Sequence, residues 1–348
     1  MSKGSILMIG NYLSSPRHNR NVWHELADRL EATGWSILRT SSREAQLPRL
    51  LDMLGTILKK KDRYDLVQID VFSGRAFMYA ELCTWLLGLL QKPVVLTLHG
   101  GGLPEFASHN VIRVRRLLQS TEYVTTPSPY LKNNLGIYRS DIRIIPNPVE
   151  PSVSIYRHRN KLEPKLVWVR AFHKTYNPVM AVIVLCELSK DFPEVKLTMI
   201  GPDKGDGSLE RLLQAAKDCN VEDNLLVIPA IPHAEVPTYL DQNDIFINTS
   251  NYDTAPRSII EAMANGLCIV STNVGGIPWL IKDSTQALLV PPNSPQEMVE
   301  AVKRLLTEPE LASQISRNAH NASKKYTWAR VLPLWESLFM EVIAGISE

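Results

Sequence analysis

The chain has 348 residues, 45% of them apolar and 21% charged, which is the composition of an ordinary folded protein and excludes a disordered or low-complexity chain. This length is long for one hydrophobic core and predicts two domains. The net charge of +2 is unevenly spread, with 19 Lys and Arg against 13 Asp and Glu in residues 1–150, and 19 against 23 in residues 151–348. The basic first half fits an anionic partner, such as a phospholipid surface or a lipid-linked phosphate, or ordinary surface variation. It is too weakly basic for a nucleic-acid-binding protein.

Cysteine usage and the apolar runs bear on the compartment. The four cysteines are scattered without a C-x-x-C pair, which favours a reducing environment and gives no zinc or disulfide framework. The first ten residues have too short an apolar run for a signal peptide, and the run 76–90 is too short to span a bilayer. We therefore expect a cytoplasmic chain without a transmembrane segment. Peripheral contact with the inner face of the membrane is the form that an anionic-surface partner would take.

Strands and helices are expected to alternate through the first half. Apolar runs predict strands at 5–9, 35–39, 66–69, 94–98, 123–125 and 142–145. Helical spacing of apolar residues predicts helices at 21–31, 48–60, 76–90, 111–118 and from 129 onward. This alternation is typical of a doubly wound parallel sheet.

The three prolines in residues 146–151 and the polar stretch after them predict a domain boundary. The alternation then restarts, with strands expected at 166–169, 195–200, 225–228, 245–247, 268–271 and 288–290. The helices between and after them are expected at 179–189, 209–219, 235–240, 257–265, 295–306, 310–324 and 327–343. We expect two Rossmann-like domains, 1–150 and 151–326, facing one cleft, and a C-terminal segment 327–348.

The segment 248–278 concentrates the polar chemistry. Asp253 lies in a loop before a predicted helix, Glu261 follows eight positions later, and Gly275-Gly276 can bring backbone N–H groups against an anion. The two acids could edge one cleft at the carboxyl ends of parallel strands. On spacing alone, an Asp cap and a solvated helical Glu explain them equally well.

Several common site motifs are missing from the sequence. Neither Gly10-Asn11 after the first strand nor Gly201-Pro202 forms the G-x-G-x-x-G dinucleotide fingerprint, and no P-loop or G-x-S-x-G segment is present. No cluster of His, Cys or Asp has the spacing of a metal site. The residues therefore indicate a site for a diphosphate-linked ligand, with neither a metal nor another cofactor.

The second half resembles the donor domain of family 4 retaining glycosyltransferases, which have the GT-B fold. That family's signature is an acid, seven residues, and then Glu-Ala-Met-Ala-x-Gly, and this chain has Asp253, seven residues, and Glu261-Ala-Met-Ala-Asn-Gly266. The runs 199–203, 269–278 and 289–293 continue the pattern. The first half matches more weakly, through 97–101 and 145–149. The resemblance implies that the last helix crosses back to the first domain, anchored by Trp328, Leu332, Trp335 and Leu338.

Roles carried over from the family begin with three charged residues. Glu261 would accept hydrogen bonds from the ribose hydroxyls, and Asp253, in a place that usually holds Glu, would face the sugar. Arg170 would hold the diphosphate and stabilise charge on the leaving group, with a surface or ion-pair role as the alternative. Lys174 stands one position before the place of the family's lysine. The two interpretations, that it is a second phosphate ligand and that it has no such role, are equally good. The other residues assigned to the donor are Gly201, Ile231, Ala255, Pro256, Arg257 and Ser258.

Residues assigned to the first domain match the family less closely. His99 corresponds to a histidine that faces the reacting sugar, with a loop-capping role as the alternative. The loop after the first strand would serve the phosphates or the acceptor, and we place Gly10, Asn11, Arg17 and His18 there. His173 and His233 lack partners in the sequence pattern and are expected to be structural.

The resemblance implies a metal-independent, retaining transfer of a sugar from a nucleotide diphosphate-sugar to a sugar, lipid-linked or other hydroxyl acceptor. Polysaccharide, glycolipid or other glycoconjugate synthesis is the expected setting. A nucleotide-sugar epimerase of the same fold is one alternative. Another is a catalytically inactive partner that only binds the nucleotide-sugar, because Asp253, Pro256 and Trp279 depart from the family pattern.

Overall fold

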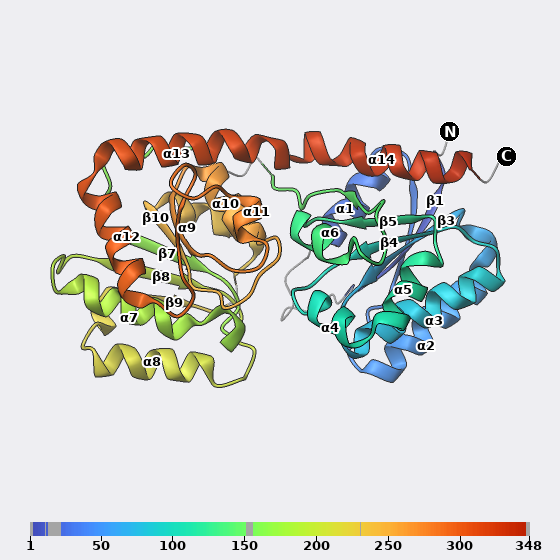
Figure 1. The fold of residues 1–348 in the computed structure, drawn as a ribbon, viewed down its shortest axis with the longest axis horizontal. Helices are drawn as coiled ribbons and strands as arrows, with labels where there is room; N and C mark the ends of the chain where they lie inside the picture. The colour runs from blue at the N-terminus through green and yellow to red at the C-terminus, as the bar shows by residue number, and fades with distance from the viewer. Residues whose placement is uncertain (1–2, 11, 13–21, 151–155, 230, 346–348) are drawn as a thin grey trace. The chain divides into compact units, whose positions relative to one another are not determined.

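The computed structural model describes residues 3–10, 12, 22–150, 156–229 and 231–345. The chain divides into two units (Figure 1). Unit 1 comprises Met1–Asn147 together with Ala329–Glu348, and unit 2 comprises Pro148–Trp328. The division falls within the proline-rich segment, and residues 329–345 belong to the same unit as the first strand.

Unit 1 is built on a six-stranded parallel sheet in the order β2-β1-β3-β4-β5-β6. Its strands are β1 (Ser5–Ile9), β2 (Ser36–Thr40), β3 (Leu66–Val71), β4 (Val94–Leu98), β5 (Tyr123–Thr126) and β6 (Arg143–Ile144). Its helices are α1 (Val22–Ala32), α2 (Gln46–Lys59), α3 (Arg75–Leu89), α4 (Leu103–His109), α5 (Val111–Gln119), α6 (Pro129–Leu135) and most of α14 (Trp328–Ala344).

Helices cover both faces of the unit 1 sheet, so β1, β3 and β4 are buried along almost their whole length. Leu7 and Ile9 of β1 join the core formed with helices α2 to α6. On α14, Trp335 packs edge-on against Trp23 of α1, with ring centroids 5.7 Å apart, and Phe339 packs against Trp35. Of the expected anchors, Trp335 and Leu338 are buried in unit 1 and Leu332 is half-buried, whereas Trp328 is buried but belongs to unit 2.

Unit 2 is a second six-stranded parallel sheet, in the order β12-β11-β10-β7-β8-β9. Its strands are β7 (Lys165–Val169), β8 (Lys196–Ile200), β9 (Leu225–Ile228), β10 (Ile245–Asn248), β11 (Cys268–Thr272) and β12 (Leu288–Val290). Its helices are α7 (Pro178–Ser189), α8 (Ser208–Asp218), α9 (Val236–Asp241), α10 (Arg257–Asn265), α11 (Ile277–Leu280), α12 (Pro295–Thr307) and α13 (Pro309–Ser323).

Alternate residues of the unit 2 strands enter two cores. Leu166 and Trp168 of β7 pack with α7, α8 and α12, whereas Val167 between them packs with α9 and α10. This alternation follows from the two-residue period of a strand, and it explains why β7 reads as a continuous apolar run in the sequence. The predicted two doubly wound parallel sheets are confirmed. Two short helices, α4 of seven residues and α11 of four residues, are not among the predicted elements.

Arg159 holds several segments of unit 2 together. The sequence places it in a polar linker, yet its side chain is wholly buried and donates to the backbone oxygens of Asn265, Leu240 and Asn243. Burial is the main cause of lowering its pKa to about 10, and the carboxylates of Asp244 and Asp241 oppose that effect. The guanidinium thus joins the carboxyl ends of α10 and α9, where it adds hydrogen bonds to carbonyl groups at and just after the last helical turns.

Candidate functional site

Both sheets have a topological switch point, where the chain changes its direction of winding. In unit 2 this point lies between the neighbouring strands β7 and β10, and in unit 1 it lies between β1 and β3. Ligands of open parallel sheets bind at such points, outside the carboxyl ends of the strands. The polar residues that follow these four strands are therefore the candidates for ligand contact in each unit.

At the switch point of unit 2, Arg170 follows β7 and Asp253 follows β10. The Arg170 guanidinium forms an ion pair with the Asp253 carboxylate, and both side chains are largely buried. Arg170 also lies over the ring of Tyr176, 5.1 Å from its centroid. The structure thus brings together the two residues that the sequence assigned to the diphosphate and to the sugar.

Glu261 lies one turn inside α10 and is buried. Its Oε1 atom is 2.7 Å from Nε2 of His233 and 3.0 Å from Nε of Arg257. Burial raises the pKa of Glu261, but the hydrogen bond from His233 and the positive charges of Arg257 and Arg170 outweigh it, so the pKa lies below its usual value. Glu261 is therefore a buried, ionised hydrogen-bond acceptor rather than a solvated helical glutamate.

Two glycines fix the loops around these acids. A Cβ atom on Gly201 would lie 1.7 Å from the carbonyl oxygen of Arg170, and one on Gly276 would lie 1.9 Å from that of Thr254. The N–H of Gly276 donates to the carbonyl oxygen of Asp253, and the N–H of Gly201 donates to that of Ile228. From the sequence, the Gly275-Gly276 amides are expected to be available to an anion. In the structure, the Gly276 amide instead holds the Asp253 loop.

Lys174 begins a 3₁₀ turn, Lys174–Tyr176, and its side chain is exposed. Its backbone N–H donates to Asp206, and this bond is the first cause of lowering the Asp206 pKa to about 2. The turn leads directly to Tyr176 under the Arg170 guanidinium. The structure thus leaves the Lys174 ammonium on the surface of the same loop as Arg170.

The remaining donor-side predictions lie around the start of α10. Pro256 precedes the helix, Ser258 is buried, and its hydroxyl has no hydrogen-bond partner among the residues described. Ala255 is half-buried, and Ile231 packs beside the core that includes α10. Arg257 differs from these residues because its side chain already contacts Glu261.

At the switch point of unit 1, Asp70 on β3 is a buried carboxylate that the sequence did not single out. Its Oδ1 atom accepts a hydrogen bond of 2.9 Å from Gln68 and lies 3.5 Å from Nε2 of His99. His99 follows β4 and packs edge-on against Trp23, with ring centroids 5.0 Å apart. Its Nε2 atom is buried without a hydrogen-bond partner among the residues described. The predicted His99 thus lies beside an acid.

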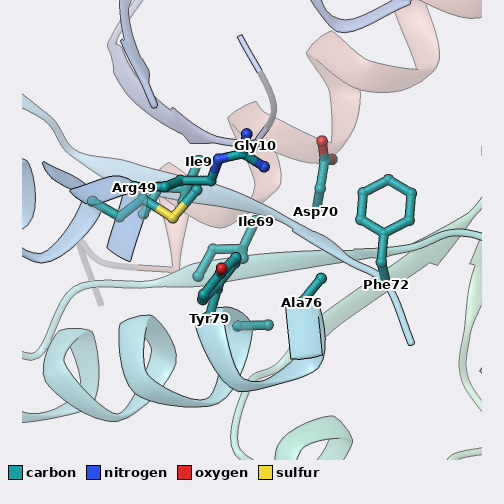
Figure 2. Close-up of a pocket in the computed structure, with 10 residues that line it drawn as sticks. Ile9, Gly10, Arg49, Ile69, Asp70, Phe72, Ala76 and Tyr79 are labelled. Atoms are coloured by element: carbon teal, nitrogen blue, oxygen red, sulfur yellow. The ribbon is translucent and has the colours of Figure 1, made fainter. Parts of the chain in front are cut away.

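Gly10 follows β1 and lies against this acid. A Cβ atom at position 10 would be 2.4 Å from Oδ2 of Asp70, so the carboxylate occupies the space that a side chain would take. A pocket of about 60 Å³ opens at this place, and Arg49 of α2 and Tyr79 of α3 reach it from the helices (Figure 2). Gly10, assigned to a ligand loop from sequence, therefore lines a small pocket with one carboxylate.

Two residues of these sites escaped the sequence interpretation. His233 was expected to be structural, but it contacts Glu261, which lies 28 positions away. The sequence signal of Asp70 is a charged residue, two positions after Gln68, in a mainly apolar run that forms a central strand. Asn11, Arg17 and His18 lie outside the residues that the structure describes, so their assignment stays a prediction.

Neither a metal-binding cluster nor a membrane-spanning helix occurs among the residues described. Those residues contain no group of three or more His, Cys, Asp or Glu side chains arranged to hold a metal ion. The helices described likewise include none that combines the length and the hydropathy needed to cross a bilayer.

Family models match both halves of the chain. The model described as glycosyl transferases group 1 matches residues 156–322, and the model described as glycosyltransferase family 4 matches residues 15–153. Among curated proteins, an uncharacterized glycosyltransferase of Haemophilus influenzae is 29% identical over 152 residues, which is 43% of this chain. A phosphatidylinositol N-acetylglucosaminyltransferase subunit of Homo sapiens is 27% identical over 207 residues, which is 58% of this chain. The chain spans only 42% and 41% of the length of these two relatives.

Solved structures match over nearly the whole chain. Sucrose-phosphate synthase from Thermosynechococcus elongatus superposes with a TM-score of 0.80 at 17% identity, over 98% of this chain and 100% of that one. HepE of Anabaena, solved with UDP-glucose, superposes with a TM-score of 0.79 at 14% identity, over 97% of this chain and 100% of that one.

Two doubly wound parallel sheets and these superpositions define the class as proteins of the GT-B fold. The Glu261 motif, which extends from Asp253 in the loop after β10 to Gly266 at the end of α10, lies within the part of unit 2 that the group 1 model matches. The chain belongs to the group 1 glycosyltransferases, glycosyltransferase family 4.

Proposed function

We propose that this chain transfers a sugar from a nucleotide diphosphate-sugar to an acceptor hydroxyl, with retention of the anomeric configuration. The observation that carries the proposal is the ionised Glu261, buried between His233 and Arg257 and near Arg170 at the switch point of unit 2. A ribose presents two neighbouring hydroxyl donors, and a buried carboxylate accepts such bonds strongly. HepE, which shares the fold, was solved with UDP-glucose, and this supports a nucleotide-sugar as the donor class.

In the proposed reaction, the bond between the anomeric carbon and the diphosphate oxygen breaks, and the acceptor oxygen bonds to that carbon on the same face. The acceptor proton passes to the leaving diphosphate, so no protein nucleophile is required. The negative charge that develops on the diphosphate would be stabilised by Arg170 and, from the same loop, by Lys174. We propose that these side chains take the place of a divalent metal ion and that the reaction needs no other cofactor.

The acceptor side of the proposal rests on unit 1. Asp70 and His99 both lie at the carboxyl end of the sheet, and the pocket beside them is small and lined mainly by apolar groups. A neutral hydroxyl group fits this setting, because it can donate to Asp70 without adding a charge. We infer an acceptor from polysaccharide or glycolipid synthesis, since one relative is named as a phosphatidylinositol N-acetylglucosaminyltransferase component. A nucleic-acid partner is not part of the proposal.

A two-stage experiment tests this function. UDP-, GDP- and ADP-sugars are first screened for a rise in melting temperature, because a ligand that binds the folded state stabilises it. The donor found is then incubated with hydroxyl acceptors, and the anomeric configuration of the product is read by NMR, with and without EDTA. Transfer with retention in EDTA is expected. Interconversion of the nucleotide-sugar without an acceptor would point to an epimerase, and donor binding without turnover would point to an inactive binding partner.

A further inference from the structure

Helix α3 lies on the surface of unit 1 yet carries apolar residues on opposite sides. Phe77, Ala80 and Leu87 face the core. Met78, Leu82, Trp85 and Leu89, at spacings of four, three and four residues, form a second stripe away from it. Trp85 is 65% exposed and Leu89 is 64% exposed. A surface helix normally turns polar residues outward, so a helix that is apolar on both sides indicates a partner for the outer stripe.

The neighbouring helices α2 and α5 also expose apolar side chains. α3 packs between α2 and α5 (Figure 1). A groove of about 550 Å³ runs between α3 and α5 and is lined by Trp85, Leu89 and Arg116. Leu51 and Leu58 of α2 are exposed, and Ile112 at the start of α5 is 83% exposed. We call the surface formed by Leu51, Leu58, Met78, Trp85, Leu89 and Ile112 the α3 face.

Exposed cations lie on, or directly after, the three helices that carry the α3 face. The exposed cations are Lys59 at the end of α2, Lys61 just after it, Arg75 at the start of α3, and Arg115 and Arg116 on α5. The acid that lines the groove, Glu81, is already neutralised by Arg113, with 2.6 Å between its carboxylate oxygen and the guanidinium nitrogen. The basic character of the first half of the sequence is therefore concentrated, in part, around an exposed apolar surface.

We propose that the α3 face docks on an anionic phospholipid bilayer. Exposed Trp and Leu side chains would enter the interface between headgroups and acyl chains, while the surrounding cations would bind lipid phosphates. A second copy of the chain fits less well, because a two-fold contact through this face would bring like charges together at its rim. This inference does not depend on the proposed reaction, since it concerns a surface of unit 1 outside the two switch points.

Co-sedimentation of the full chain with vesicles tests the proposal. Vesicles of phosphatidylcholine with phosphatidylglycerol should carry the protein down at low salt, and vesicles of phosphatidylcholine alone should not. Leu89→Glu should lower the partition onto anionic vesicles about ten-fold or more, because it places a charge within the apolar stripe. The double variant Arg115→Glu, Arg116→Glu should lower it by about the same factor, and its effect should shrink as salt is raised.

Matched controls come from unit 2. Leu226 on β9 is 53% exposed, so Leu226→Glu makes the same chemical change away from the α3 face. Lys217→Glu with Lys282→Glu matches the charge change at two exposed unit 2 lysines. Both controls should bind vesicles as the unchanged chain does. All these side chains are exposed, and a thermal melt checks that each variant is folded.

Two results would overturn the proposal. One is the absence of binding through the α3 face. In that case either the full chain stays in solution with anionic vesicles at low salt, or the unit 2 controls weaken vesicle binding as much as the α3 face variants do. The other is a concentration-dependent dimer in sedimentation velocity that Leu89→Glu abolishes while vesicle binding is unchanged. The second result would assign the α3 face to another copy of this chain.

Discussion

Both switch points contain buried carboxylates, but the surroundings of these acids differ. In unit 2, Glu261 contacts His233 and Arg257, and the Arg170–Asp253 ion pair lies at the same switch point. In unit 1, Asp70 receives a hydrogen bond from the neutral Gln68 amide and has His99 at 3.5 Å. The same doubly wound architecture thus carries a site with many charged groups in unit 2 and a mostly apolar site in unit 1. This difference supports the proposal of an anionic ligand for unit 2 and a neutral hydroxyl compound for unit 1.

Removing the unit 2 carboxylate should have the largest effect. Glu261→Ala should lower kcat/KM for transfer by about two orders of magnitude or more, since hydrogen bonds from ligand hydroxyls to a charged group contribute about 1.5–3 kcal/mol each. The fold should persist, as judged by circular dichroism. Glu210→Ala on the exposed face of α8 is the matched control and should leave turnover unchanged. Normal turnover in Glu261→Ala would remove the assignment of this site to the donor.

Replacing the Asp70 carboxylate of unit 1 should lower acceptor turnover without changing nucleotide affinity. Asp70→Asn keeps the shape of the side chain and should lower kcat/KM for the acceptor by about ten-fold, because one charged hydrogen-bond acceptor is lost. The affinity for a nucleoside diphosphate, measured by calorimetry, should stay the same. Equal losses in acceptor turnover and nucleotide affinity would contradict the division of roles between the two units. Gly10→Ala should resemble Asp70→Asn, because its Cβ atom would displace the carboxylate.

The Arg170–Asp253 ion pair can be tested with two variants whose effects on nucleoside diphosphate affinity are expected to differ in direction. Arg170→Ala should weaken nucleoside diphosphate binding by about ten-fold, since a guanidinium–phosphate hydrogen bond is lost. Asp253→Asn should bind the nucleoside diphosphate at least as tightly as the unchanged chain, because the guanidinium is released from its carboxylate partner. Calorimetry measures both variants. Weaker binding in Asp253→Asn would show that the ion pair orients Arg170 for the ligand instead of competing with it.

The smallest expected effect is a pH dependence of stability in unit 2. The pKa of Glu261 is lower in the folded chain than its usual value of 4.5, so the unfolded chain takes up its proton first as the pH falls. The stabilisation by Glu261 is therefore complete above that usual value and is lost as the pH falls through the folded pKa. Urea unfolding should show a difference in the free energy of unfolding between the unchanged chain and Glu261→Gln. This difference should become smaller as the pH falls. A difference that stays the same at all pH values would contradict the explanation of the lowered Glu261 pKa by its cationic neighbours.

Much of the fold was predictable because its signals are local. Apolar runs such as 94–98 and 268–271 lie between helices of regular period, and the Asn265-Gly266 pair ends α10 as its composition indicates, with Gly266 at φ 75°. The Asp253 and Glu261 spacing was visible for the same reason, because both flank one helix start. Within the sequence alone, however, the solvated and the buried interpretation of Glu261 were equally good.

The structure decided between them through contacts that join distant residues. His233 is 28 positions from Glu261, and Arg170 is 83 positions from Asp253. Such pairs depend on the strand order, which places β7 beside β10 although β8 and β9 lie between them in the chain. Asp70 and His99 meet for a related reason, since β3 and β4 are neighbours that end at the same edge of the sheet.

The sequence by itself determined the alternation of strands and helices, the proline-rich boundary and the family motif, because each depends on neighbours along the chain. Only the tertiary structure decided that the buried Arg159 side chain joins several segments of unit 2, that Asp70 lies against Gly10, and that α3 exposes a second apolar stripe. Those outcomes depend on which side of a helix meets the sheet and which strand ends lie together. Packing fixes both, and no local pattern of residues contains that information.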